Sequence, residues 1–125
     1  MTLAHVAAIR NSLADLVVDA IDAGAGAGSI EFQTSGDVEV ATLTFSDPAF
    51  GAASSGTATA NSIASDTNAT GGTIAKFRVF DSDSNEVFSG SVTASGGGGD
   101  IEITSVAIGA GDTVSISSLT YSASV

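Results

Sequence analysis

Residues 74–92 read IAKFRVFDSDSNEVFSGSV. In the first half of this stretch, the apolar residues Phe77 and Val79 alternate with charged ones, which is the period of a half-buried β-strand. The polar residues at 81–85 are of the kinds that favour turns, because Asp, Ser and Asn side chains bond to nearby backbone groups. An apolar pattern resumes after them. The stretch therefore predicts a β-hairpin with a five-residue turn.

Outward from this hairpin, short segments of period two alternate with clusters of Gly, Ser, Asn and Asp. We expect seven strands, near residues 29–34, 38–45, 56–64, 73–80, 85–93, 100–108 and 113–123. The glycine run at 96–99 predicts a flexible loop tip. No helical segment separates the strands, which argues against parallel βαβ units. The fold class is therefore mainly β, with an antiparallel β-sandwich or jelly-roll-like domain over residues 29–125.

Residues 1–23 form a separate N-terminal segment without Gly or Pro between positions 3 and 23. Apolar residues recur there at steps of three and four, which predicts an amphipathic α-helix of about five turns. Thr2 is the expected N-cap, and Gly24 stands where a left-handed C-terminal cap is expected. The small residues at 24–28 predict a Gly/Ala hinge that is too small and flexible to pack.

The two faces of the predicted helix differ in polarity. The apolar face offers a candidate interface made of Leu3, Val6, Ile9, Leu13, Leu16 and Val17. The opposite side carries Asn11, Asp15, Asp19 and Asp22 at the same spacing. If the small β domain does not cover the apolar face, a neighbouring subunit must.

The composition narrows the possible functions. The chain has 125 residues, with 14 acidic against 3 basic side chains and a net charge of -11, which argues against a nucleic-acid surface. The absence of Cys excludes disulfides and thiolate metal sites. No apolar stretch approaches the roughly 20 residues of a membrane span, and no signal-peptide pattern is visible. A Cys-free domain of this size is expected to gain stability by forming a homo-oligomer.

One motif resembles a cation site. Asp81, Asp83 and Asn85 have the alternate spacing of oxygen ligands that opens a calcium loop. However, Glu86 stands where such a loop needs Gly, and Val92 where it needs Glu. We therefore favour a polar hairpin turn and leave a bound cation as the alternative.

No residue pattern points to catalysis. His5 is the only histidine, and no nucleophile motif such as G-x-S-x-G accompanies it. Glycoside hydrolysis would need two carboxylates aimed at one cleft, and the sequence selects no such pair. We expect no cofactor, no metal and no enzymatic activity.

Three segments, taken in order, resemble a known family. They are residues 10–24, the stretch LTFSDPAF at 43–50, and FRVFDSDSNEVFSGSV at 77–92. Together they are similar to small proteins encoded among the structural genes of tailed bacteriophages. In that family the turn more often reads D-S-D-G-N, whereas this chain has Ser84 in place of the Gly. In the middle segment, Asp47-Pro48 predicts a corner that returns Phe45 and Phe50 to the core.

The resemblance implies a non-enzymatic virion structural protein, as a head decoration, collar or tail-associated subunit. Its expected partners are other virion proteins and further copies of itself, which would form a homo-oligomer, expected to be a trimer. No nucleic acid or membrane is expected as a partner. The chain would assemble in the bacterial cytoplasm. The alternative is a host-surface adhesin whose loops bind glycan or receptor, and such loops are expected to carry Tyr or Trp.

Overall fold

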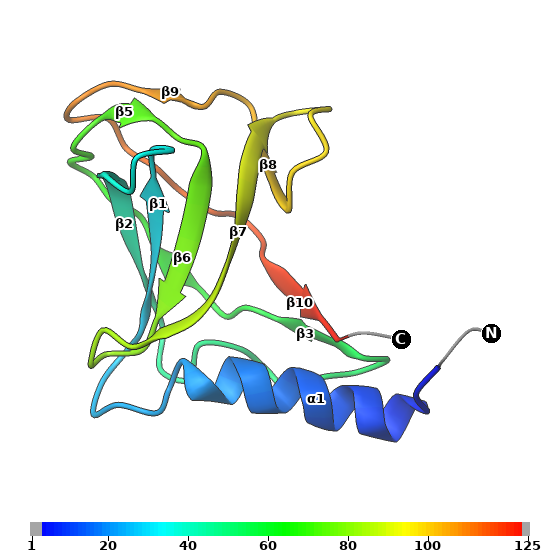
Figure 1. Ribbon diagram of the computed structural model, residues 1–125. Coiled ribbons are helices and arrows are strands. Elements are labelled where there is room, and N and C mark those ends of the chain that lie inside the picture. The colour runs from blue at the N-terminus through cyan, green and yellow to red at the C-terminus, as the bar shows by residue number, and fades with distance from the viewer. Residues whose placement is uncertain (1–3, 124–125) are drawn as a thin grey trace.

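A computed structural model describes residues 4–123 as a mainly β structure preceded by one helix (Figure 1). The elements are α1 (Ala7–Ala20), β1 (Ser29–Gln33), β2 (Glu39–Phe45), β3 (Thr57–Thr59), β4 (Ile63–Ala64), β5 (Gly72–Thr73), β6 (Lys76–Phe80), β7 (Glu86–Ala94), β8 (Ile101–Ile103), β9 (Ala107–Ile108) and β10 (Thr120–Ser122). This arrangement confirms the predicted fold class.

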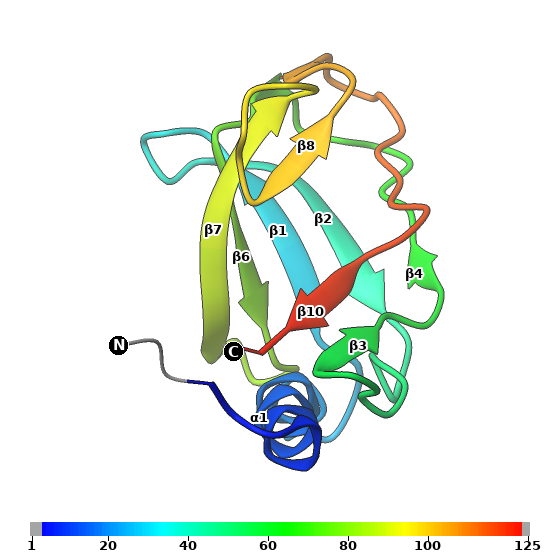
Figure 2. The same ribbon diagram turned by 90° about the vertical axis from the view of Figure 1, so that its right-hand side faces the viewer.

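The main sheet has six strands in the order β4-β2-β1-β6-β7-β8 and curls into a half-barrel. The small sheet of β10 and β3 lies across the open side, and α1 runs beneath the lower end of the strands (Figure 2). A third pair, β5 and β9, lies at the upper end. The polypeptide therefore surrounds one core from several sides.

The predicted hairpin is confirmed. Strands β6 and β7 are antiparallel and are joined by the five residues 81–85. Phe77 and Val79 are buried, while Lys76 and Arg78 lie on the outer face and pair with Asp37 and Glu86, respectively. Local alternation was sufficient here because one face of the hairpin covers the core and the other meets solvent.

The expectation of a purely antiparallel sheet is wrong at one pair of strands. β7 and β8 are parallel, with Val92 opposite Ile101. The chain doubles back through the glycine run, in which Gly96 and Gly98 adopt positive φ angles of 87° and 81°. Both N–H groups donate to the carboxylate of Glu102, so this loop is an anchored connection, not a loose tip.

Four predicted strands are interrupted. The stretch at 73–80 divides into β5 and β6, and the stretch at 100–108 divides into β8 and β9. The stretch at 56–64 divides into β3 and β4, because the chain leaves β10 and then joins the edge of β2. In the stretch at 113–123 only β10 and a single bridge from Val114 to Asp66 are regular. A change of pairing partner cannot be read from periodicity, since both halves alternate in the same way.

The core lies on the concave side of the half-barrel. Its largest fully buried side chains are Phe32, Ile21, Ile30, Leu43, Ile74, Val18, Val40 and Val79. The predicted corner at Pro48 is confirmed, because Phe45 and Phe50 are both buried with ring centroids 5.8 Å apart. Val18 and Ile21 extend this core into the helix, so the helix is packed against the β domain.

The helix is shorter than predicted. It begins at Ala7, after Val6 in an extended conformation, and the proposed cap at Thr2 lies outside the described residues. It ends at Ala20 with Ile21 as a right-handed C-cap, so the expected Gly24 cap is wrong. The physical reason is tertiary: Ile21 is completely buried and Asp22 bonds to the distant Ala49 N–H.

The expectation that residues 24–28 are too small to pack is also wrong. Gly28 is buried, and a Cβ at this position would lie 2.4 Å from the carbonyl oxygen of Phe80 and 2.5 Å from Cγ2 of Ile21. The N–H of Gly26 donates to the Ser82 hydroxyl at 3.2 Å. Small residues are used here because the backbone passes close to its neighbours.

Candidate functional site

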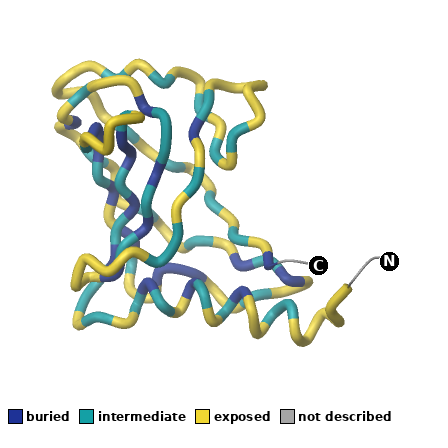
Figure 3. Tube along the Cα trace, in the orientation of Figure 1, coloured by how far each residue is buried: buried dark blue, intermediate teal, exposed yellow. Residues whose placement is uncertain are grey.

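The candidate site is an apolar stripe that the helix leaves exposed. Its members are the N-cap residue Val6 and Ile9, Leu13 and Leu16 of α1, and their exposed fractions are 69%, 48%, 37% and 71%. We call these four residues the helix stripe. Figure 3 shows exposed segments recurring along the helix, whereas most of the central strands are buried or half-buried. Of the remaining predicted interface residues, Val17 is half-buried, and Leu3 lies outside the described residues.

The orientation of the helix is set by its polar side chains. Asn11 Oδ1 accepts a hydrogen bond from Gly56 N–H at 2.7 Å, and Asp15 Oδ1 accepts one from Ala53 N–H at 2.8 Å. Further along the helix axis, Asp22 Oδ1 accepts from the N–H of Ala49 at 3.0 Å. Side chains that the sequence placed opposite the apolar face therefore attach the helix to the segment at 49–56.

These contacts explain why the apolar stripe faces outward. Ala14 and Val18 are buried under the same segment, between the polar anchors. The Arg10 side chain packs against Gly56, where a Cβ would lie 2.7 Å from its Cζ. Three backbone N–H groups would lose their acceptors if the helix turned its apolar side inward. The stripe is thus held on the surface, where it is a candidate interaction site.

The spacing of the stripe is that of a helix–helix interface. The four residues are separated by three, four and three positions, as are the a and d positions of a heptad. A helix of 14 residues is about 21 Å long, so the stripe spans most of it. The only other large apolar side chain exposed to a similar extent among residues 4–123 is Val38, in the β1–β2 connection at the opposite end of the molecule.

The Asp81 turn uses its carboxylate internally. Oδ1 accepts the N–H groups of Asp83 and Asn85, both at 2.9 Å, and Oδ2 accepts the Asn85 side-chain amide at 3.1 Å. These hydrogen bonds, chiefly the one from the Asn85 N–H, lower the pKa of Asp81. Ser84 has a positive φ of 66°, a conformation in which Gly is favoured. The contacts are those of the polar hairpin turn that the sequence favoured.

The pKa of Asp22 is shifted in the opposite direction to that of Asp81. Desolvation by burial raises its pKa, the hydrogen bond from Ala49 opposes this, and the nearby charges of Asp47 and Asp19 raise the pKa further. The anchor of the helix C-terminus is therefore held with some electrostatic cost at neutral pH.

His5 is exposed just before the helix, and no group of three or more His, Cys, Asp or Glu side chains within residues 4–123 is arranged to hold a metal ion. In the same range no helix is long and apolar enough to cross a membrane.

The sequence identified the stripe but missed the anchors. Asn11 and Asp15 gave a recognisable signal, since both lie on one face at a spacing of four. Their acceptor role could not be predicted because the N–H groups that they bind lie 45 and 38 residues away. No known protein family, characterised protein or solved structure matches this chain.

Proposed function

We propose that this chain is a non-enzymatic structural protein of a tailed-bacteriophage particle, attached by burial of the helix stripe. The observation that carries the proposal is that this stripe is held outward by three polar anchors, with the spacing of a helix–helix seam. The stripe packs against the same helix of neighbouring copies, and the proposed homo-oligomer is a trimer. The order of the three sequence segments supports the assignment to a phage particle.

The charge of the chain supports a place on the outside of the particle. A net charge of -11 repels packaged DNA as well as anionic surfaces. Attachment must then come mainly from apolar contact, which the helix stripe supplies. We propose a head decoration, collar or tail-associated position on the exterior.

The adhesin alternative has less support from the placement of aromatic residues. The only Tyr of the chain, Tyr121, lies in β10 with its ring 5.3 Å from that of Phe88, and the chain has no Trp. Receptor-binding loops are usually rich in Tyr and Trp. The structural role is therefore the proposal that we develop.

The proposal is tested by incorporation into particles. Leu13→Asp places a carboxylate in the proposed interface, and burying it unpaired costs several kcal/mol. Ser84→Asp is the matched control, because it adds the same group at an exposed hairpin tip. We expect particles purified on a density gradient to lose the first variant and retain the second, measured as copies per particle by mass spectrometry. Equal incorporation of two folded variants would contradict the proposal.

A further inference from the structure

The half-barrel has an open seam between β7 and β10. On one side, residues 86–91 of β7 pair with β6, whereas β8 joins β7 only at residues 92–94. On the other side, β10 pairs with β3 and with no other strand among residues 4–123. Within residues 4–123, these two strand edges therefore have no strand partner along this stretch, and Figure 1 shows β7 and β10 running on the same side of the half-barrel.

The backbone groups at this seam are directed into it. Val92 N–H donates to the carbonyl of Ala75, just before β6, and alternation along β7 then directs the N–H and C=O of Ser89 away from β6. On β10, Leu119 and Ala123 bond to the β3 segment, so the groups of Thr120 and Ser122 face the opening by the same alternation. Unpaired edges of this kind are templates for a further strand.

The floor of the seam is apolar. A groove of about 380 Å³ is lined by side chains of both strands. The Phe88 ring lies 5.3 Å from that of Tyr121 and 6.1 Å from that of Phe77, centroid to centroid, so β7 and β10 are in aromatic contact across the seam. Ile101 and Leu119 also line a second cavity of about 150 Å³ deeper in the half-barrel.

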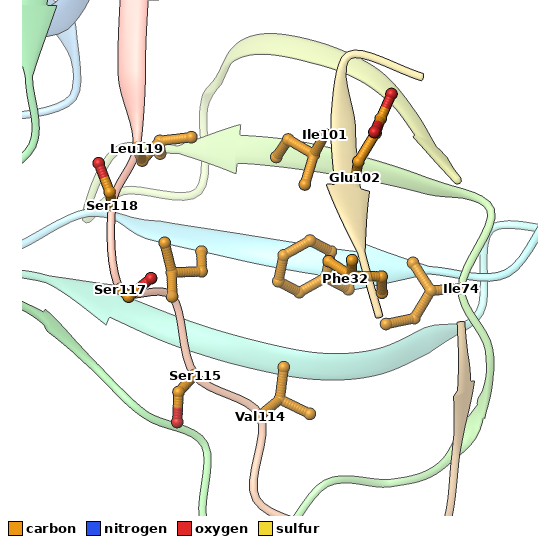
Figure 4. A pocket seen from close by; sticks show the side chains of 11 residues that line it. Phe32, Ile74, Ile101, Glu102, Val114, Ser115, Ser117, Ser118 and Leu119 are labelled. Atoms are coloured by element: carbon orange, nitrogen blue, oxygen red, sulfur yellow. The ribbon is translucent and has the colours of Figure 1, made fainter. Parts of the chain in front are cut away.

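Figure 4 shows this second cavity. The side chains of Phe32, Ile74 and Val114 point into it, whereas the Glu102 carboxylate points away. A strand laid along the seam would place every second side chain toward the apolar floor and the others toward solvent. The seam therefore has the two features of a strand-addition site, namely unpaired main-chain groups at a strand edge and pockets for alternate side chains.

The charge in the groove indicates which side chains a bound strand would carry. Asp100 is the only charged residue that lines it, and Oδ2 accepts the N–H and hydroxyl of Ser91. The three cationic side chains of this protein are engaged elsewhere: Lys76 with Asp37, Arg78 with Glu86, and Arg10 against Gly56. A second copy, which also carries -11, offers little to complement Asp100.

We propose that the seam between β7 and β10 binds one extended segment of a different protein, with apolar side chains at alternate positions and a Lys or Arg beside Asp100. The segment adds a strand to the edge of β7 or β10, or bridges both. This inference does not rest on the helix stripe, which lies on a different element. A helix-stripe variant is therefore expected to bind the segment as the wild type does.

The probe is a capped peptide, Thr-Val-Thr-Val-Lys-Val-Thr, added to the full chain. Amide hydrogen exchange followed by NMR is expected to show new protection at Ser89, Thr120 or Ser122. Replacing the peptide Lys by Glu should weaken binding about two- to fivefold, the range of an exposed ion pair. A peptide N-methylated at every residue should not bind, because it has no N–H group to donate to either strand edge. The proposal is overturned if the unmodified peptide protects none of these amides, or if the N-methylated peptide binds equally.

Two variants complete the test. Ser89→Pro removes a seam-facing N–H without removing a bond to β6, so it should abolish binding at the β7 edge, whereas Ser89→Ala should keep it. Asp100→Asn should remove the preference for the Lys peptide over the Glu peptide. If Ser89→Pro does not fold, this second variant provides the test. Peptide binding that is unchanged in folded Ser89→Pro would refute the assignment of the β7 edge. An unchanged Lys preference in Asp100→Asn would refute the assigned charge contact.

Discussion

Replacing Leu16 by Ala should weaken assembly while leaving the fold intact. The side chain is 71% exposed in the single chain, so most of its apolar surface is free to be buried by a partner. Complete burial of a Leu side chain stabilises by about 1.5–3 kcal/mol, which leaves about 1–2 kcal/mol per subunit for assembly. In a trimer this amounts to about 3–6 kcal/mol, or a decrease of about 100- to 10,000-fold in the association constant.

The matched control is Val18→Ala, on the buried side of the same helix. Val18 is 2% exposed, and the loss of two buried methyl groups should lower the free energy of unfolding by about 2 kcal/mol. Its effect on association should be small, because Val18 faces the body of the protein. Leu16→Ala should change the free energy of unfolding of the monomer by no more than about 0.5 kcal/mol.

Sedimentation equilibrium measures the association constants, and urea unfolding at concentrations where the monomer predominates measures the folding free energies. The reasoning is refuted if the wild type is a monomer at micromolar concentration. It is also refuted if Leu16→Ala loses as much folding free energy as Val18→Ala while its association is unchanged.

Three substitutions and a salt wash test the remaining parts of this interpretation. Gly28→Ala should lower the free energy of unfolding by about 1–3 kcal/mol through overpacking. Gly36→Ala should have little effect, because the atom nearest to the added Cβ would be 3.8 Å away. Thermal unfolding of the two variants makes the comparison. Because the folded-state pKa of Asp81 is lowered, its stabilisation is complete above the ordinary value of 3.8 and is lost as the pH falls through the lowered pKa, so Asp81→Asn should be less stable at pH 7 and approach the wild type in acid. The raised pKa of Asp22 has the opposite sign: stability falls as the pH rises from 3.8 through the raised value, and Asp22→Asn should lack this fall in unfolding measured across pH. Particles washed at about 1 M salt should keep the protein at least as well as at about 0.05 M, since screening weakens repulsion between acidic copies but not apolar contact; release only at high salt would show that ion pairs hold it.

Local patterns determined the hairpin and the existence of the helix. Alternation in β6, the turn residues from Asp81 to Asn85 and the apolar repeat of the helix each depend on residues within a few positions of one another. The spacing also identified the helix stripe as one apolar face. These features are encoded in the sequence because their stabilising contacts are mostly between near neighbours.

Tertiary contacts decided the ends and orientation of the helix, the parallel pairing of β7 with β8, and the open seam. The helix stops at Ala20 because the next two residues are held by the core and by Ala49 N–H. Its apolar stripe faces outward because Asn11 and Asp15 find backbone donors about 40 residues further along the chain. Such distant partners leave no periodic trace in the sequence, since a carboxylate that caps a remote N–H and one that meets solvent occupy the same position in the pattern.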